Sequence, residues 1–122
     1  PMVTLVNKGT ASASEILAGS LQDNKRSILM GEQTYGKGLI QSLKSLGEES
    51  GIAITVASYL TPKGNNIQGQ GITPDKILDL PDAIEYGSAD DKWVRNAELS
   101  LDSLLEKEEI SIQNIELSNE EI

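Results

Sequence analysis

Apolar and polar positions follow two different periods along the first part of the chain, which predicts short strands joined by a helix. The apolar run at residues 3–6 is typical of a buried strand, and a second short strand is predicted over residues 27–30, around the apolar run at 28–30. Between these runs, four apolar residues recur at the spacing of a helix with one buried face: Ala13, Ile16, Leu17 and Leu21. We therefore expect a helix over about residues 13–22, ended by the polar turn at 23–26.

Period-two alternation appears further along the chain. Residues 39–46 and 52–60 are predicted to be strands that form a hairpin around the polar loop at 47–51. In the second strand, Ile52, Ile54, Val56 and Leu60 share one face. The same period places Lys37, Leu39 and Gln41 on one face of an extended stretch. The glycine-rich and proline-containing residues 62–75 are expected to be irregular.

Helical spacing returns from Ala89 onward, where five apolar side chains recur: Trp93, Ala97, Leu101, Leu104 and Leu105. Asp90 or Asp91 can occupy the first turn of this helix, where negative charge is favoured. Trp93 is expected to anchor the helix to the body of the domain. After Glu106 the sequence has no complete apolar face, so we expect a tail that is frayed or held only by a partner.

Composition limits the chemistry. The chain has 122 residues, 38% of them hydrophobic, with no cysteine and no histidine, which suits a single α/β unit with a modest core. The missing histidine excludes Ser-His-Asp and Cys-His catalysis within this chain. The missing cysteine excludes thiolate nucleophiles, disulfides and zinc-thiolate sites. Any nucleophilic catalysis must therefore use Ser, Thr or Lys.

The acidic charge is concentrated near the end of the chain. The formal net charge is −9, and residues 89–122 carry ten acidic and three basic residues. Nucleic acid is therefore not an expected partner. The sequence contains no long apolar segment, so no membrane span is expected. It begins with Pro1 rather than methionine, which indicates a processed product or an excised piece.

Ser12 lies where the first predicted strand gives way to the first predicted helix, in the segment GTASASEI at residues 9–16. Such an elbow holds a hydroxyl at the tip of a rigid turn, and the unpaired amides of the first helical turn point toward whatever binds beside it. A nucleophile and part of an oxyanion hole can then come from adjacent residues. Taken alone, the segment favours a capping box between Ser12 and Glu15, which is common at helix starts. The two roles are compatible, because Ser14 offers a second hydroxyl.

Lys37 lies between Gly36 and Gly38. A solvated surface lysine needs no such neighbours, whereas two glycines let other backbone approach closely. A lysine in a tight turn is the alternative. Residues 31–37 also match the G-x-x-x-x-G-K pattern of a phosphate-binding loop. Gly38 stands where that pattern needs Ser or Thr, and a strand rather than a helix follows, so we do not expect nucleotide binding.

Three separated segments resemble the carboxyl-terminal processing peptidases, also called tail-specific proteases, which are serine proteases with a Ser-Lys dyad. The segments read LVNKGTASASEILAGSLQDN, MGEQTYGKGLIQS and YLTPKGNNIQGQGITPD, and they occur in the family's order between residues 3 and 80. Three motifs in order are far more specific than any one of them. The resemblance implies an α/β fragment of the ClpP/crotonase-like fold, with a mixed sheet and packed helices.

The resemblance also implies roles for individual residues. Ser12 corresponds to the nucleophile, Lys37 to the general base, and Gln41 to the residue that positions the lysine. The amide of Ala13 is the natural oxyanion donor on this chain. Lys37 must be uncharged to accept a proton, so we expect it to be buried away from acids, and a salt bridge from Glu32 would disable it. This chemistry requires no metal and no organic cofactor.

By the same resemblance, residues 1–88 are the catalytic half of a protease domain, and residues 89–122 are an acidic helix and tail. The PDZ domain and the first half of the protease domain, which supplies the second oxyanion donor, are expected to be missing from this chain. The chain by itself is therefore expected to be inactive. A non-catalytic peptide-binding or assembly domain of the same fold is the alternative.

The substrates implied by the resemblance are unstructured carboxyl-terminal segments of proteins, bound in an extended form that adds a strand to the sheet. The run SGIAITVASYLTPKGNNIQGQGI and the Trp93 helix look most like cyanobacterial and plastid members. This likeness suggests an exported enzyme that trims the precursor of a photosystem II reaction-centre protein in the thylakoid lumen. A periplasmic quality-control protease is the rival, and the sequence leaves the oligomeric state open.

Overall fold

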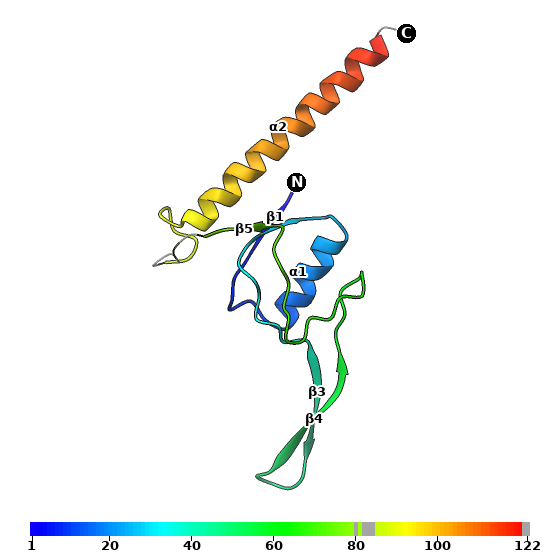
Figure 1. Cartoon of the computed structure of the whole chain (residues 1–122), viewed down its shortest axis with the longest axis vertical. Coiled ribbons are helices and arrows are strands. Elements are labelled where there is room, and N and C mark those ends of the chain that lie inside the picture. The colour runs from blue at the N-terminus through cyan, green and yellow to red at the C-terminus, as the bar shows by residue number, and fades with distance from the viewer. Residues whose placement is uncertain (80, 82–84, 121–122) are drawn as a thin grey trace.

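The body of the domain is built on a three-stranded parallel sheet. The computed structural model describes residues 1–79, 81 and 85–120, with side chains described as far as residue 111. Strand β1 (Val3–Val6) pairs with β2 (Ile28–Gly31), and β2 pairs with β5 (Lys76–Ile77), in the order β1-β2-β5. Helix α1 (Ala13–Asp23) connects β1 to β2 and contacts β2 (Figure 1). The sequence predicts β1, α1 and β2 to within a residue or two, but not the short β5.

The two faces of the sheet are covered by different parts of the chain. One buried cluster lies on the α1 side and consists of Val6, Ala18, Leu29, Ile67 and Ile72. The other cluster contains Met30, Leu78 and Trp93. The neighbouring residues Leu29 and Met30 belong to opposite clusters because successive side chains of a strand point to opposite faces. This two-sided cover is typical of parallel sheets.

The buried face of α1 differs from the predicted one. Its buried residues are Glu15, Ala18 and Gly19, whereas Ala13 and Leu17 are exposed. A Cβ at Gly19 would lie 2.8 Å from Ile72 Cδ1, so this glycine allows the segment around Ile72 to pack closely on the helix. The hydrophobic spacing therefore predicts the helix correctly and its buried face in part: Ile16 packs against the cluster as predicted, but a buried carboxylate and a glycine occupy the rest of the inner face.

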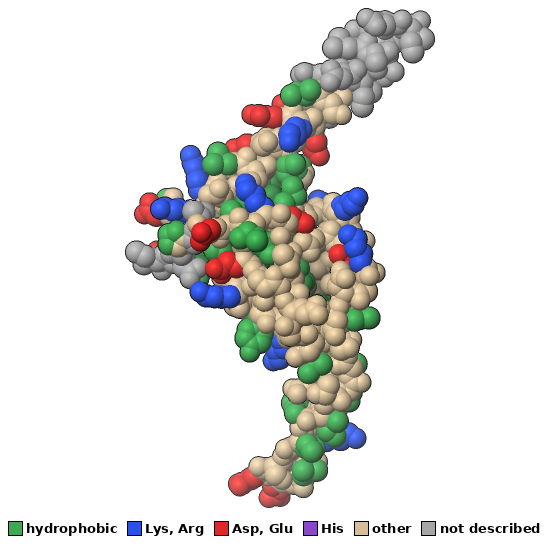
Figure 2. Space-filling view, in the orientation of Figure 1, with side chains coloured by type: hydrophobic (Ala, Val, Ile, Leu, Met, Phe, Trp, Pro, Cys, Tyr) green, Lys and Arg blue, Asp and Glu red, His purple; other side chains and the backbone are tan. Residues whose placement is uncertain are grey.

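Strands β3 (Leu39–Ser45) and β4 (Gly51–Ser58) form a separate antiparallel hairpin that projects from the body (Figure 1). Its register shifts between Ile40 and Gln41, where the pairing skips Val56 of β4. Every residue of β4 is exposed, as is Leu43 of β3. Figure 2 shows hydrophobic side chains along this hairpin and acidic ones at its tip. The described residues therefore leave the predicted apolar face of the hairpin uncovered.

Helix α2 (Lys92–Glu120) begins against the sheet and extends away from it, on the side opposite the hairpin (Figure 1). Trp93 is buried beside Met30 and Leu78, which confirms its predicted anchoring role. The tail expected to be frayed or held only by a partner is helical through Glu120, which contradicts the fraying, and its side chains are exposed from residue 106 to 111; residues 121–122 lie outside the described part. Within the described residues, no helix combines the length and the apolar composition needed to cross a membrane.

Candidate active site

The turn between β1 and α1 holds Ser12 in an unusual backbone conformation. Its φ is 56° and its ψ is −119°, in a region that residues other than glycine rarely adopt. The preceding turn is braced by Asn7, whose Oδ1 accepts a hydrogen bond from the Gly9 amide at 2.9 Å and whose carbonyl accepts one from the Thr10 amide at 2.9 Å. Conformations of this kind cost about 1–3 kcal/mol and cluster at functional sites. The predicted elbow is therefore present at Ser12.

Glu15 connects this elbow to the lysine loop. Its carboxylate Oε2 accepts hydrogen bonds from the backbone amides of Ser12 at 2.9 Å and Lys37 at 2.8 Å. Its Oε1 accepts hydrogen bonds from the Thr34 hydroxyl at 2.5 Å and the Gly36 amide at 2.6 Å. A single buried carboxylate thus binds the two segments that carry the proposed dyad.

The Glu15 carboxylate is stabilised in its ionised form. Burial opposes ionisation, but the hydrogen bonds from Thr34, Gly36, Lys37 and Ser12 together hold the pKa of Glu15 below its ordinary value. Ser12 and Glu15 have the reciprocal geometry of the predicted capping box, in which the Ser12 amide donates to Glu15 Oε2. The S-x-x-E pattern therefore predicts the contact of Glu15 with the Ser12 amide, but not the three contacts with the lysine loop.

The glycines on either side of Lys37 permit a close approach by residues 67–71. Gly69 donates to the Gly36 carbonyl at 2.9 Å, and the Gly38 amide donates to Gln68 Oε1 at 2.9 Å. A Cβ at Gly38 would lie 2.7 Å from the Gln68 amide nitrogen, which no side chain could tolerate. The close approach predicted from the two glycines is confirmed.

The amide of Ala13 is available to an external acceptor. Ala13 is exposed at the first position of α1, and among the described residues no group accepts a hydrogen bond from its amide. First-turn amides carry the positive end of the helix dipole and favour an anionic ligand. The geometry therefore fits one half of an oxyanion hole beside Ser12.

The side chains of Lys37 and Gln41 are not buried by the described residues. Lys37 is exposed, which corrects the expectation that this chain itself keeps its amine dry. The cause is visible in the loop, where Glu15 and residues 67–71 contact the backbone of residues 36–38 rather than the lysine side chain. Gln41 is exposed on β3, and within the described residues no hydrogen bond joins its side chain to Lys37.

Glu32 is not the acid partner of Lys37. Its Oε2 lies 3.5 Å from the Lys8 amide, and no ion pair joins it to Lys37 in the part of the chain that the structure describes. Among the described residues, the ion pair that would have held the lysine in its charged form is therefore not formed.

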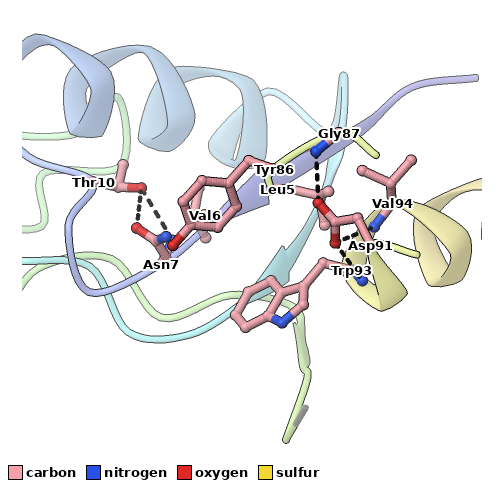
Figure 3. A pocket seen from close by; sticks show the side chains of 9 residues that line it. All are labelled: Leu5, Val6, Asn7, Thr10, Tyr86, Gly87, Asp91, Trp93 and Val94. Carbon is pink, nitrogen blue, oxygen red and sulfur yellow. Dashed lines mark hydrogen bonds between the residues drawn. The ribbon is translucent and has the colours of Figure 1, made fainter. Parts of the chain in front are cut away.

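A cavity of about 260 Å³ lies between the end of β1 and the start of α2 (Figure 3). It is lined by Leu5, Val6, Asn7, Thr10, Tyr86, Gly87, Asp91, Trp93 and Val94. Asp91 forms one wall and caps α2, accepting hydrogen bonds from Gly87 at 2.8 Å and Trp93 at 2.9 Å (Figure 3). The Gly87 hydrogen bond is the largest of the contacts that lower the pKa of Asp91. Ser12 and Lys37 do not line the cavity, although Asn7 and Thr10 of the turn that precedes Ser12 do.

A strained elbow serine, a free first-turn amide and a nearby lysine loop are together typical of enzymes that form an acyl intermediate on serine. Residues 1–78 match the sequence profile of Peptidase family S41. The chain belongs to this peptidase family, as the three motifs predict.

Two relatives show how much of a family member the chain represents. It is 60% identical over 81 residues to the carboxyl-terminal-processing protease of Synechocystis sp., covering 66% of this chain and 19% of that protein. It is 54% identical over 88 residues to the chloroplastic C-terminal processing peptidase of Tetradesmus obliquus, covering 70% of this chain and 19% of that protein. The chain spans about a fifth of the length of these relatives.

Solved structures confirm the predicted fold. The chain resembles the photosystem II D1 C-terminal processing protease with 57% sequence identity and a TM-score of 0.61, over 65% of this chain and 20% of that one. It also resembles mature CPAF with 22% identity and a TM-score of 0.56, over 62% of this chain and 15% of that one, a likeness of fold only. The expected mixed sheet contains both parallel and antiparallel strands. In the described residues the parallel strands β1, β2 and β5 form one sheet, and the antiparallel strands β3 and β4 form another.

Proposed function

We propose that this chain is the dyad-bearing part of a serine endopeptidase that cleaves proteins near their carboxyl termini. In this proposal Ser12 is the nucleophile, Lys37 is the general base and Gln41 positions the lysine. The amide of Ala13 donates one hydrogen bond to the oxyanion. Residues 1–88 form the catalytic half of the protease domain, and residues 89–122 form the appended acidic helix.

The observation that carries the proposal is the strained backbone of Ser12, held next to the lysine loop by Glu15. A serine that only capped a helix would not need a φ of 56°, because capping residues usually adopt an extended conformation. Here the strain is maintained by the Asn7 turn on one side and the Glu15 carboxylate on the other. Strain supported in this way is a mark of a functional position.

The proposed reaction proceeds through an acyl-enzyme. Lys37 takes the proton of the Ser12 hydroxyl as its oxygen attacks the scissile carbonyl, and the oxyanion that forms accepts a hydrogen bond from the Ala13 amide. The amine of Lys37 then returns the proton to the departing amine of the substrate, which breaks the peptide bond. In the second half, Lys37 activates the water that hydrolyses the ester.

A base of this kind has to be neutral, and lysine is neutral only where water and acids are kept away. Lys37 is exposed in this chain, and the hairpin of β3 and β4 exposes apolar side chains such as Leu43, Ile54 and Val56. We therefore propose that other parts of the intact protease cover both the Lys37 side chain and the apolar side chains of the hairpin. The chain by itself is expected to be inactive.

The proposed substrates are unstructured carboxyl-terminal segments of proteins, bound as an added strand. One similar structure is titled a photosystem II D1 C-terminal processing protease, and relatives come from cyanobacteria and chloroplasts. These names support trimming of a photosystem II precursor in the thylakoid lumen, with a periplasmic protease as the alternative setting.

A serine-directed fluorophosphonate probe on the intact protease tests the dyad. Labelling should be lost in Ser12→Ala and strongly reduced in Lys37→Ala, because one change removes the nucleophile and the other its base. Ser14→Ala is the matched control, since Ser14 is an exposed hydroxyl two residues away that should not affect labelling. Labelling that survives both Ser12→Ala and Lys37→Ala would refute the dyad.

The exposure of Lys37 favours one second candidate, a non-catalytic domain that binds peptides or assembles with partners. The same probe separates the two functions. An intact protein that binds carboxyl-terminal peptides but is never labelled at Ser12 would be a binding module on a peptidase fold.

A further inference from the structure

We infer that Glu15 is a positioning residue for the dyad, whose ionised carboxylate sets the spacing between the Ser12 elbow and the Lys37 loop. This inference rests on the proposed function, since it matters to catalysis only if Ser12 and Lys37 react. Glu15 touches neither the substrate carbonyl nor the lysine amine in this role. It acts through the backbone amides on either side of the reacting groups.

The hydrogen-bonding capacity of Glu15 is fully used. An ionised carboxylate has about four lone-pair directions. Four donors fill them: the amides of Ser12, Gly36 and Lys37, and the Thr34 hydroxyl. The two segments are therefore connected through one rigid, planar group, and neither can move without losing a charge-assisted hydrogen bond.

Only an ionised carboxylate fits this cage. A glutamine has one oxygen and one NH₂ group. If the glutamine oxygen takes the place of Oε2, it keeps the hydrogen bonds from the Ser12 and Lys37 amides. Its NH₂ group then faces the Gly36 amide, so two hydrogen-bond donors point at each other. If the glutamine side-chain amide is flipped, its NH₂ group faces the backbone amides of Ser12 and Lys37 instead. In either orientation Glu15→Gln therefore sets an NH₂ group against at least one backbone amide of the cage, which displaces that amide from residue 15.

Asp91 shows what a purely structural carboxylate looks like in the same chain. It is also buried and accepts hydrogen bonds from three backbone amides, those of Gly87, Trp93 and Val94. Those donors all come from one local turn at the start of α2. The donors of Glu15 come instead from two segments that are far apart in sequence and carry the nucleophile and the base. This difference is why we assign Glu15 a role in positioning the reacting groups in addition to a role in folding.

The test uses the intact protease with Glu15→Gln and the matched control Asp91→Asn. Reactive serines are first counted by titration with the fluorophosphonate probe, and turnover of an unstructured peptide is then expressed as kcat per labelled serine. Because a small misplacement of reacting groups can cost about 100-fold, we expect Glu15→Gln to lower this quantity by roughly 10- to 100-fold with little change in KM. Asp91→Asn should lower the melting temperature but leave kcat per labelled serine unchanged.

Equal kcat per labelled serine in Glu15→Gln and wild type would overturn the inference while leaving the dyad intact. Absence of dyad-dependent labelling in the wild type would instead overturn the proposed function. Should Glu15→Gln fail to fold, Thr34→Val and Thr34→Ser decide. Thr34→Val removes one donor to Glu15, so it should lower kcat per labelled serine several-fold below that of Thr34→Ser, and equal values would overturn the inference.

Discussion

The backbone amides of Ser12 and Lys37 donate to one and the same oxygen atom, Oε2 of Glu15, at 2.9 Å and 2.8 Å. Their backbones are therefore fixed relative to each other before any substrate or further segment is present. What the described residues leave open is the surroundings of the lysine amine, because Lys37 is exposed. The spacing of the proposed dyad is thus set by contacts within this chain, whereas we propose that the groups that shield the lysine from water come from other parts of the intact protease.

Lys37→Arg should abolish peptide cleavage by the intact protease. Arginine keeps a positive charge but stays protonated at any usable pH, so it cannot accept the Ser12 proton. General-base catalysis is worth about 10²- to 10⁴-fold, so kcat should fall at least 100-fold. The measurement is steady-state hydrolysis of an unstructured peptide.

Lys63→Arg is the matched control for this change. Lys63 is also an exposed lysine in a turn, and its amine lies 3.8 Å from Asp23, a contact that arginine can retain. It should leave kcat unchanged. Substantial activity in Lys37→Arg would show that the charge of this residue, rather than its basicity, is what the enzyme uses.

Gly36→Ala should inactivate the protease, and comparison with Gly64→Ala separates strain from crowding. Gly36 has a φ of +90° and Gly64 a φ of +85°, so an alanine pays a similar conformational cost of about 1–2 kcal/mol at either site. A Cβ at Gly36 would also lie 2.9 Å from the Gly71 amide nitrogen, whereas nothing lies within 4 Å at Gly64. Only Gly36→Ala displaces the lysine loop.

Activity per labelled serine and thermal unfolding measure the two effects. Both variants should lose some stability, but Gly64→Ala should keep its turnover. Similar turnover in the two would mean that the loop absorbs the extra atom and that the close approach of residues 67–71 is not needed for catalysis.

The sequence predicts the elbow and the lysine loop because each carries a local signal. Ser12 is followed by S-x-x-E spacing and a helical apolar pattern, and Lys37 is flanked by glycines. Both signals depend on residues that are neighbours in the chain. The same is true of the helix that starts after Asp91 and of the anchoring by Trp93, which the structure confirms.

Other features depend on contacts between distant residues, and the sequence does not reveal them. The amphipathic pattern of α1 points to Leu17 as buried, yet Leu17 is 62% exposed and Glu15 is buried, because donors from the lysine loop compensate the charge. The two-residue strand β5 has no pattern of its own and exists through pairing with β2. The apolar neighbours of Lys37 in the sequence predict its burial, but the described residues leave its side chain exposed.

Protonation of the Glu15 and Asp91 carboxylates should lower the stability of the protein in acid. The pKa of Glu15 lies below its ordinary value of 4.5, and that of Asp91 below 3.8. A lowered carboxyl pKa stabilises the folded state above the ordinary value, and this contribution is lost as pH falls through the folded value. Unfolding free energy should therefore decline below about pH 4.5 for the Glu15 contribution and below about pH 3.8 for that of Asp91.

Urea unfolding of the intact protease at several pH values tests this assignment. The stability difference between wild type and Glu15→Gln should shrink as the pH drops below 4.5, and the difference for Asp91→Asn should shrink only at lower pH. A difference that stays constant down to pH 2 would mean that the carboxylate charge does not stabilise the cage.

Trp93→Ala should detach the start of α2, whereas Trp93→Phe should largely preserve it. The Trp93 side chain is buried against Met30 and Leu78, and its ring edge packs so close to Gly31 that a Cβ there would lie 2.6 Å from Cζ3. Truncation to alanine leaves a large cavity and should cost about 3–5 kcal/mol.

Phenylalanine refills most of this space. It also removes Nε1, a buried donor that has no partner among the described residues and that carries a penalty of about 1–3 kcal/mol. The cost of Trp93→Phe should therefore be about 1–2 kcal/mol, measured by urea unfolding, and amide exchange over residues 92–97 should rise in Trp93→Ala only. Equal losses in the two variants would show that Nε1 is satisfied in solution and that the indole contributes more than packing.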